Sequence, residues 1–132
     1  MAICDGHGLP LAVHVESASP AEVRLVEPTL EARFLADFPS RLIGDRAYDS
    51  DPLDAQLMQR WGIELIARHR STRKIPTQDG RAARRTKRRW KIERLFAWFH
   101  NSRRLVVRWE RKAENYTAFL HLACILILLK HL

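Results

Sequence analysis

The stretch RLIGDRAYDSDPLDAQLMQRWGIELIA (residues 41–67) has the pattern of a strand, a helix and a second strand. A short apolar run ends just before Asp45, Pro52 marks the first turn of the helix, and Gly62 ends it. The helix has an apolar face made by residues four apart, Leu53, Leu57 and Trp61. Residues 63–67 form the second strand. This order predicts a parallel βαβ crossover and therefore an α/β fold.

The residues before this unit predict a β-hairpin and another helix. AICDGHGLPLAVHV (residues 2–15) has apolar residues on both sides of a glycine-rich turn at Asp5. The helix is expected to begin after Ser19, its predicted N-cap, with Glu22 completing a capping box. Its apolar face is expected to be Val23, Val26, Leu30 and Phe34. Pro28 should kink or split this helix.

The C-terminal half predicts a loop and two helices. Residues 68–85 are basic, contain Pro and Gly, and lack an apolar period, which is typical of a loop. A helix is expected over residues 86–100, with an apolar stripe of Ile92, Leu95, Phe96 and Phe99. A last helix, over residues 114–129, is apolar on almost every face and is expected to be fully buried. Its apolar run, residues 117–129, is too short to span a bilayer and is interrupted by His121, so no membrane partner is expected.

The chain is strongly basic, with a formal net charge of +8 over 132 residues. This charge favours a polyanionic partner, with nucleic acid ahead of an anionic membrane surface. The alternative is that the charge only keeps the protein soluble. Eight Lys and Arg residues lie within the fourteen positions 81–94, and tryptophans are interleaved at 90, 98 and 109. Because basic side chains neutralise phosphates and aromatic rings stack on bases, nucleic acid is the expected partner.

Two carboxylates stand out by their positions. Asp45 directly follows an apolar strand, at the end of a sheet where ligands bind in α/β proteins. The alternative for Asp45 is a turn or helix-capping residue. Glu93 is the single acid in the basic stretch 88–104 and lies at the border between the apolar and polar faces of its helix. The alternative for Glu93 is an ordinary ion pair with Arg89, four residues before it.

An aspartate at a strand end, a glutamate on a later helix and a basic loop between them suit phosphodiester chemistry. Mg²⁺ prefers oxygen ligands and often takes only one or two protein carboxylates, with water and phosphate completing its shell. Pairs of such ions activate the attacking oxygen and stabilise the leaving oxygen. The expected cofactor is therefore Mg²⁺, or Mn²⁺ in its place, bound by Asp45 and Glu93.

Four segments together resemble the C-terminal part of an insertion-sequence DDE transposase. They are DGHGLPLAVHVESASPAEV, LIGDRAYDSDPL, RRWKIERLFAWFHNSRRLVVRWE and AENYTAFLHLACILILLKHL. The resemblance implies an α/β, ribonuclease H-like mixed sheet with flanking helices, incomplete at the N-terminus, with residues 1–132 forming the C-terminal portion of the catalytic domain. It also implies transposition by Mg²⁺-dependent DNA strand cleavage and strand transfer, with transposon ends and target DNA as partners.

The resemblance assigns roles residue by residue. Asp45 matches the second catalytic aspartate and Glu93 the catalytic glutamate, and both would be metal ligands. The side chains expected to contact DNA are Arg84, Arg85, Lys87, Arg88, Arg89, Lys91, Arg94, His100, Arg103 and Arg104. Two positions depart from the family pattern, since Thr86 stands where a Tyr is usual and His100 stands near the position of a Lys or Arg. A histidine at position 100 can still bind a phosphate.

The family's first catalytic aspartate has no counterpart, because it lies on a strand upstream of MAICDGHG. Asp5 is not expected to replace it, since its place before a glycine suits a turn that should lie away from Asp45. The chain by itself is therefore predicted to be inactive, as a truncated fragment or as one product of a split gene. A sheet that lacks its first strand should also have an unpaired edge.

Other interpretations stay open. A non-catalytic DNA-binding or subunit-interaction module would need the basic residues but not the two acids, and a complete metal nuclease would use Asp5. Possible protein partners are a second copy and an upstream-encoded transposase part. Cys4 and Cys124 lie in no CxxC pair or metal cluster, which favours reduced thiols in the cytoplasm, with the protein associated with the nucleoid.

Overall fold

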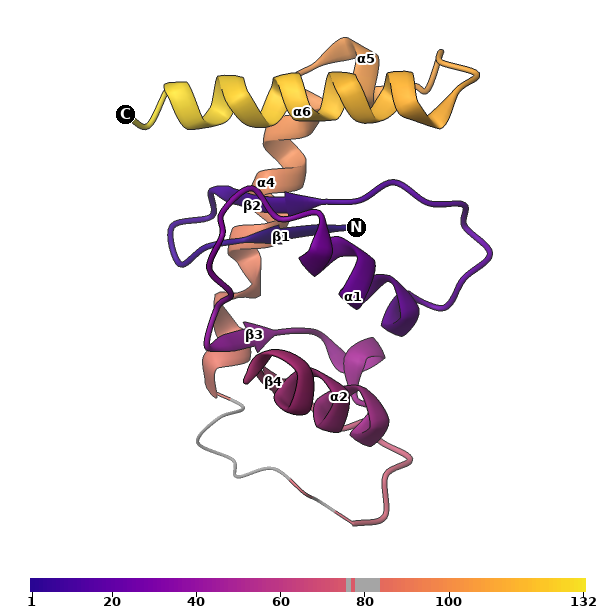
Figure 1. The fold of residues 1–132 in the computed structure, drawn as a ribbon, viewed down its shortest axis with the longest axis vertical. Helices are drawn as coiled ribbons and strands as arrows, with labels where there is room; N and C mark the ends of the chain where they lie inside the picture. The colour runs from indigo at the N-terminus through magenta and orange to yellow at the C-terminus, as the bar shows by residue number, and fades with distance from the viewer. Residues whose placement is uncertain (76, 78–83) are drawn as a thin grey trace.

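The strand, helix and strand predicted for residues 41–67 form one unit in the lower part of the molecule (Figure 1). The computed structural model describes residues 1–75, 77 and 84–132, without the side chains of residues 84–86. Strands β3 (Arg41–Ile43) and β4 (Glu64–Ile66) pair in parallel, and helix α2 (Asp51–Trp61) connects them. Gly62 ends α2 with a left-handed backbone, at φ 65°. The predicted βαβ crossover is confirmed.

The predicted hairpin is also present. Strands β1 (Ala2–Cys4) and β2 (Pro10–Val13) pair antiparallel around the turn at Asp5. The far edge of β2 is met by the chain after the first helix, where the Phe34 backbone N–H donates to the Leu11 carbonyl at 2.8 Å. The described strands form two separate two-stranded sheets, one antiparallel and one parallel, so the α/β class is confirmed but the ribonuclease H-like mixed sheet is not shown. No described strand lies between β1 and β3, so nothing joins the two pairs.

Helix α1 (Glu22–Glu31) begins later than predicted. Its N-cap is Ala21, whose extended backbone keeps Pro20 outside the helix, and no side chain caps it. The predicted split at Pro28 does not occur, because the helix continues to Glu31. Phe34 is 40% exposed, so it is not part of the buried face. Because the helix ends before Phe34, this side chain does not lie on the helix face that carries Val26 and Leu30.

The basic run and the helix after it form two elements. Residues Arg84–Arg89 make a 3₁₀ helix, η2, and α4 then runs over Trp90–His100, so the regular α-helix begins four residues later than predicted. Leu95 and Phe99 are buried as expected, whereas Phe96 is 43% exposed. Helix α4 passes behind β1 and β2 to reach the last helix (Figure 1). The residues 76 and 78–83 of the predicted loop lie outside the description.

Two clusters of buried residues hold the elements together. One joins β2, α4, the short helix α5 (Arg103–Val106) and the last helix, α6 (Ala113–Leu129). The other joins α1, α2 and the strands β3 and β4 with the partly buried Met1 and Ile3. Strand β1 contributes partly buried residues to both clusters. The molecule is therefore packed above and below β1, with α4 connecting the two parts.

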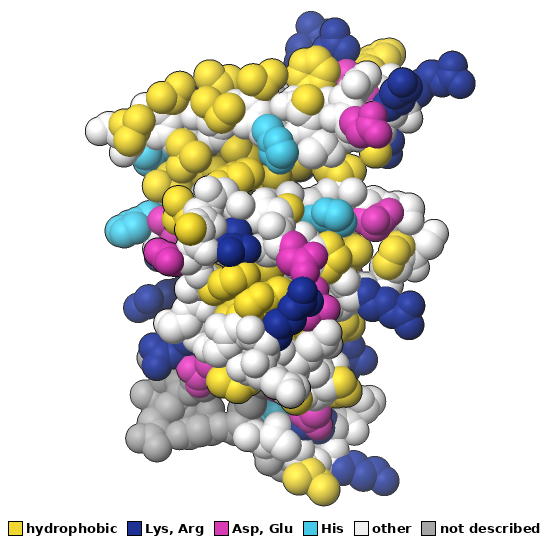
Figure 2. Space-filling view, viewed as in Figure 1, with side chains coloured by type: hydrophobic (Ala, Val, Ile, Leu, Met, Phe, Trp, Pro, Cys, Tyr) yellow, Lys and Arg dark blue, Asp and Glu magenta, His cyan; other side chains and the backbone are white. Residues whose placement is uncertain are grey.

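The expectation that α6 is fully buried is wrong. One face packs on the core through Leu120, Ala123, Cys124 and Ile127. The opposite face carries exposed apolar side chains, Leu122, Ile125, Leu126 and Leu129. Figure 2 shows apolar side chains in a row along the top of the molecule, where α6 lies. The described part of the chain contains no helix long and apolar enough to cross a membrane.

Candidate functional site

A groove of about 730 Å³ lies between the two sheets. Its lining includes every residue of β1 and of β3. Helix α1 contributes Leu25 and Val26, and α4 contributes Ile92 and Phe96. In Figure 1 the two strands lie one above the other, and α1 and the start of α4 flank the space between them. The groove therefore has a strand on each of two sides, and both apolar and charged side chains on the others.

Asp45 lies directly after β3 and lines this groove. Its Oδ1 accepts a hydrogen bond from the Ala47 backbone N–H at 2.7 Å and so caps the short 3₁₀ helix η1 (Arg46–Tyr48). The alternative of a helix-capping aspartate is thus confirmed as one role of Asp45. The cap fixes the carboxylate at the end of the strand, where it faces the groove with Oδ1 already engaged.

The turn before Asp45 depends on Gly44. A Cβ at Gly44 would come within 2.9 Å of Tyr48 Cδ2, so only glycine lets the Tyr48 ring pack against this backbone. Burial of the Tyr48 phenol, with the nearby charges of Glu22 and Asp45, raises its pKa to about 12. The phenol therefore stays neutral near pH 7 and adds no charge beside Asp45.

Glu93 lines the same groove from the first turn of α4. Its side chain is 68% exposed, and its Oε1 lies 4.0 Å from Nη2 of Arg89. The alternative of an i−4 ion pair is therefore confirmed, but the pair is long and largely solvated. Although Asp45 and Glu93 are 48 positions apart in the sequence, the fold brings both to one groove.

The carboxylates that line the groove do not form a metal-binding cluster in the part of the chain that the structure describes. Across residues 1–75, 77 and 84–132 there is no group of three or more His, Cys, Asp or Glu side chains that could hold one metal ion. Asp5 also lines the groove, so its turn does not lie as far from Asp45 as expected. Its Oδ1 is committed to the turn, since it accepts the N–H of His7 at 2.7 Å and of Leu9 at 2.9 Å. Asp45 and Glu93 are oxygen donors of the kind that Mg²⁺ binds together with water and phosphate.

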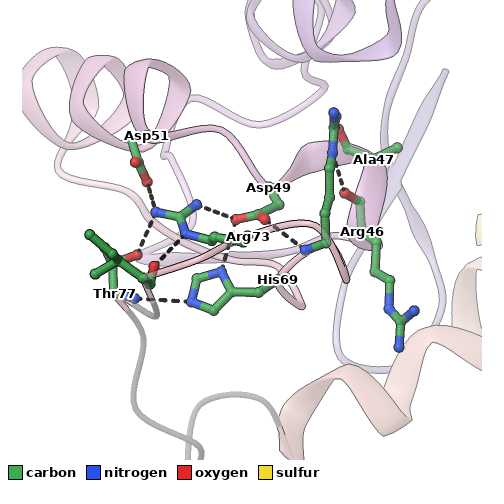
Figure 3. Close-up of polar contacts among 9 residues, drawn as sticks. Arg46, Ala47, Asp49, Asp51, His69, Arg73 and Thr77 are labelled. Carbon is green, nitrogen blue, oxygen red and sulfur yellow. Dashed lines mark hydrogen bonds and ion pairs between the residues drawn. The ribbon is translucent and has the colours of Figure 1, made fainter.

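A polar network beside Asp45 was not predicted from the sequence. At its centre is Asp49, whose side chain is 3% exposed (Figure 3). Asp49 Oδ1 accepts from His69 Nδ1 at 2.9 Å and from Arg73 Nη1 at 2.7 Å, and Oδ2 accepts from the Arg70 backbone N–H at 2.8 Å. Burial alone would raise the pKa of Asp49, but these hydrogen bonds and the Arg73 charge outweigh it and lower the pKa. Both oxygens of the Asp49 carboxylate therefore already accept hydrogen bonds from the protein.

The network ties the start of the basic loop to the turn after β3. Arg73 also pairs with Asp51 and donates to Thr77 Oγ1 at 2.9 Å. The Thr77 backbone N–H donates to His69 Nε2 at 3.1 Å, which leaves Nδ1 of a neutral ring to donate to Asp49 (Figure 3). Parallel strands end at one edge of a sheet, so the segments after β3 and β4 must meet there. That rule would have predicted that Asp49 lies near residues 68–73, but it would not have predicted the individual hydrogen bonds.

The side chains expected to contact DNA differ in exposure and in their contacts within the protein. Lys87, Arg88, His100 and Arg103 are exposed. Three others contact the protein itself: Lys91 donates to the Gly6 carbonyl, Arg94 donates to the His7 carbonyl, and Arg104 Nη1 lies 3.1 Å from Glu110 Oε1. Arg89 is half-buried and pairs with Glu93, as described above. The side chains of Arg84 and Arg85 lie outside the description, although their backbone belongs to η2.

Arg94 has a second structural role. Its guanidinium carbon lies 4.9 Å from the ring centroid of Trp90 and 4.8 Å from that of Trp98, residues four positions before and after it on α4. Cation–π contacts of this kind fix the side chain along the helix. With its bond to the His7 carbonyl, Arg94 fastens α4 to the hairpin turn. DNA could contact only those atoms of Arg94 that these interactions leave exposed.

Comparison with known proteins identifies the family. A sequence profile of the family described as the transposase DDE domain matches residues 1–128, and the chain belongs to this family. The chain is also 37% identical to a protein named as a transposase for insertion sequence element IS402 from Burkholderia cepacia. That match covers 95% of the chain but 59% of the relative, so the chain spans about three fifths of the relative's length. No solved structure matches the chain.

Proposed function

We propose that this chain is the C-terminal portion of a ribonuclease H-like DDE catalytic domain that cuts and joins DNA strands during transposition. The observation that carries the proposal is the shared groove, which Asp45 and Glu93 both line from elements far apart in the sequence. Family membership supports a role in transposition. The basic side chains of Arg88 and Arg89 line the same groove, which gives a phosphate backbone a binding surface beside the acids.

In this proposal the two acids hold Mg²⁺ or Mn²⁺ and the basic residues hold DNA. Asp45 presents a fixed carboxylate, because its cap on Ala47 sets its orientation. Glu93, being exposed and weakly paired, exchanges its contact with Arg89 for the metal at low cost. When bound, Mg²⁺ would activate the attacking oxygen and stabilise the leaving oxygen of the phosphodiester. Arg89, once released, is then available to a phosphate.

The isolated chain should be inactive or nearly so in strand cleavage. Of the three catalytic carboxylates that the family uses, two have counterparts in this chain, Asp45 and Glu93, and Asp5 is occupied by the hairpin turn. We infer that the third carboxylate comes from another polypeptide segment, either upstream-encoded or from another subunit. Metal binding and DNA binding are therefore better tests of this chain than catalytic turnover.

Metal binding can be measured with Mn²⁺, whose electron paramagnetic resonance signal changes on coordination. The expected result is binding that increases in the presence of duplex DNA and that is lost in Asp45→Asn and in Glu93→Gln. Asp37→Asn is a matched control, because Asp37 is exposed and does not line the groove. Equal Mn²⁺ binding by all four proteins would contradict the proposed ligands.

DNA binding can be measured by fluorescence anisotropy over a range of salt concentrations. Lys87→Ala, Arg88→Ala and Arg103→Ala should each weaken binding and should each reduce the salt dependence by about one counterion per phosphate contact. Arg24→Ala, which removes an exposed charge from α1, is the control. Affinities that fall equally in all four variants would indicate a response to net charge alone.

The second candidate is a non-catalytic DNA-binding or subunit-interaction module. The lack of a third metal ligand among the described residues favours it. In that case Asp45→Asn and Glu93→Gln leave DNA affinity unchanged or raise it, and Mn²⁺ does not bind. Nicking of DNA by the purified chain with Mg²⁺, abolished by Asp5→Asn, would instead support a complete nuclease and overturn both proposals.

A further inference from the structure

We propose that Arg70 is a positioning residue for Asp45, because from outside the groove it holds the peptide group that orients the Asp45 carboxylate. The importance of that carboxylate rests on the proposed function, in which Asp45 binds a metal ion. Arg70 does not itself line the groove, whereas Asp45 does. The effect of Arg70 on Asp45 therefore passes through the backbone between them.

Arg70 lies next to the turn that Asp45 caps. It follows β4, and Asp45 follows β3, the parallel partner of β4. The segments after parallel strands meet at one edge of the sheet. The Arg70 backbone N–H donates to Asp49 Oδ2 at 2.8 Å, and Asp49 is the buried centre of the polar network. Figure 3 shows Arg46 and Ala47 beside that network. The backbone of Arg70 is thus anchored within reach of this turn.

The peptide group between Arg46 and Ala47 is held at both ends. Its N–H belongs to Ala47 and donates to Asp45 Oδ1 at 2.7 Å. Its carbonyl belongs to Arg46 and accepts from Arg70 Nε at 3.2 Å. A peptide group is planar, so a contact that fixes the direction of its carbonyl also fixes the direction of its N–H. Arg70 therefore sets the direction of the donor to which the Asp45 carboxylate is bound.

The guanidinium of Arg70 also holds the next peptide group. Its Nη2 donates to the Ala47 carbonyl at 2.9 Å. Nε and Nη2 lie along one edge of a planar guanidinium, so two donors at a fixed spacing meet two successive carbonyls. A rotation of the turn would break both hydrogen bonds at once. A lysine carries its donors on a single nitrogen and lacks this fixed pair.

The turn benefits from such a clamp because it is short. It is a 3₁₀ helix of three residues, and hydrogen bonds in 3₁₀ helices have poorer geometry than those in α-helices. Within the turn, the Arg46 carbonyl also accepts from the Asp49 N–H, at a long distance of 3.4 Å. The bond from Arg70 to this carbonyl is shorter and comes from a charged donor, which makes it the stronger of the two.

Arg70 and Arg73 belong to one network but hold different groups. Arg70 is exposed, and its side chain donates to backbone carbonyls of the turn. The side chain of Arg73 is 16% exposed and pairs with the buried Asp49 and with Asp51. Loss of Arg73 deprives a buried carboxylate of a donor and should cost more stability than loss of Arg70. The two arginines therefore allow a positioning role to be separated from a structural one.

Amide hydrogen exchange of Ala47 tests the clamp without a metal ion. Arg70→Met removes the side-chain donors and retains the backbone N–H, so this variant is expected to fold. The Ala47 amide should then exchange about fivefold faster than in the wild type, because its bond to Asp45 weakens. The amide of Leu57, a buried residue of α2, is the internal reference for changes in global stability.

Mn²⁺ binding tests whether the clamp affects the carboxylate. Loss of a positive charge near a bound cation should by itself raise the Mn²⁺ affinity. Arg46→Met measures this charge effect, because it removes an exposed charge from the same turn and retains the carbonyl that Arg70 holds. Arg70→Met should bind Mn²⁺ about tenfold more weakly than Arg46→Met, as for other residues that orient metal ligands.

Arg73→Gln is the control for stability. It should unfold at a lower urea concentration than Arg70→Met, yet bind Mn²⁺ at least as tightly as the wild type and leave the exchange of the Ala47 amide unchanged. If Arg73→Gln does not fold, Arg46→Met remains as the control. A loss of Mn²⁺ affinity in Arg73→Gln as large as in Arg70→Met would overturn the proposal, because the effect would then belong to the network as a whole.

Two further results would overturn the role of Arg70. One is equal exchange of the Ala47 amide in Arg70→Met and in the wild type. The other is equal Mn²⁺ affinity of Arg70→Met and Arg46→Met, because Arg70 would then hold the turn without affecting the carboxylate. If the wild type does not bind Mn²⁺, the proposed function fails instead, and the exchange of the Ala47 amide alone decides whether Arg70 positions Asp45.

Discussion

Asp49 and Glu93 are two carboxylates whose environments differ in opposite ways from that of Asp45. Asp49 is 3% exposed and accepts hydrogen bonds from two side chains and one backbone N–H. Glu93 is 68% exposed and has one ion pair at 4.0 Å. A carboxylate whose donors are all supplied by the fold stabilises the protein, whereas a weakly paired one remains available to a ligand. Asp45 is intermediate, since it caps a short helix and also faces the groove.

Replacing Asp49 should have the largest effect on stability. Asp49→Ala leaves the donors of His69, Arg70 and Arg73 without their acceptor and should lower the free energy of unfolding by about 2 kcal/mol. Urea denaturation followed by circular dichroism measures this, with the exposed Asp37→Ala as control. If both variants unfold at the same urea concentration, the network contributes nothing to stability and the contrast with Glu93 fails.

The lowered pKa of Asp49 also predicts how stability depends on pH. A carboxyl whose pKa is lower in the folded than in the unfolded state, where it is about 3.9, stabilises the protein fully above that value. This contribution is lost as the pH falls through the folded-state pKa. The difference in unfolding free energy between the wild type and Asp49→Asn should therefore shrink as the pH falls below about 4. A difference that stays constant from neutral pH to acid would contradict the role of the Asp49 charge.

Asp45 should show an intermediate effect that depends on the substituent. Asp45→Ala removes the acceptor for the Ala47 N–H and should cost about 1 kcal/mol, as for other capping residues. Asp45→Asn keeps a side-chain oxygen and should cost clearly less. Thermal and urea unfolding of both variants separates the cap from the charge. A large loss of stability in Asp45→Asn would mean that the charge itself stabilises the fold.

Local signals explain which parts of the fold could be predicted from the sequence. The β3–α2–β4 unit was predicted because Pro52, Gly62 and the apolar face of α2 act within a few residues of one another. The separation of the two sheets could not be predicted in this way, because it depends on which strands find partners. The exposed face of α6 was missed for the same reason, since an apolar pattern does not show which side another element will cover.

The same distinction between local signals and long-range contacts applies to the candidate site. Asp45 and Glu93 were selected by their positions after a strand and within a basic helix, and the fold brings both to one groove. The role of Asp49 was not predicted, because its partners His69 and Arg73 lie 20 and 24 positions away in the sequence and follow another strand. Contacts between segments that follow parallel strands become predictable once the pairing of those strands is known.

The smallest effect on stability is expected for Glu93. Glu93→Gln removes a long, solvated ion pair with Arg89 and should cost only a few tenths of a kcal/mol. Glu93 also lies in the first turn of α4, where a negative charge is favoured by the helix dipole. Glu114→Gln in the first turn of α6 is a matched control for that term, because Glu114 is exposed as well. The difference between the two variants in urea denaturation then isolates the contact with Arg89. If Glu93→Gln cost about as much as Asp49→Ala, Glu93 would be a structural residue, and its availability to a metal ion would lose its physical basis.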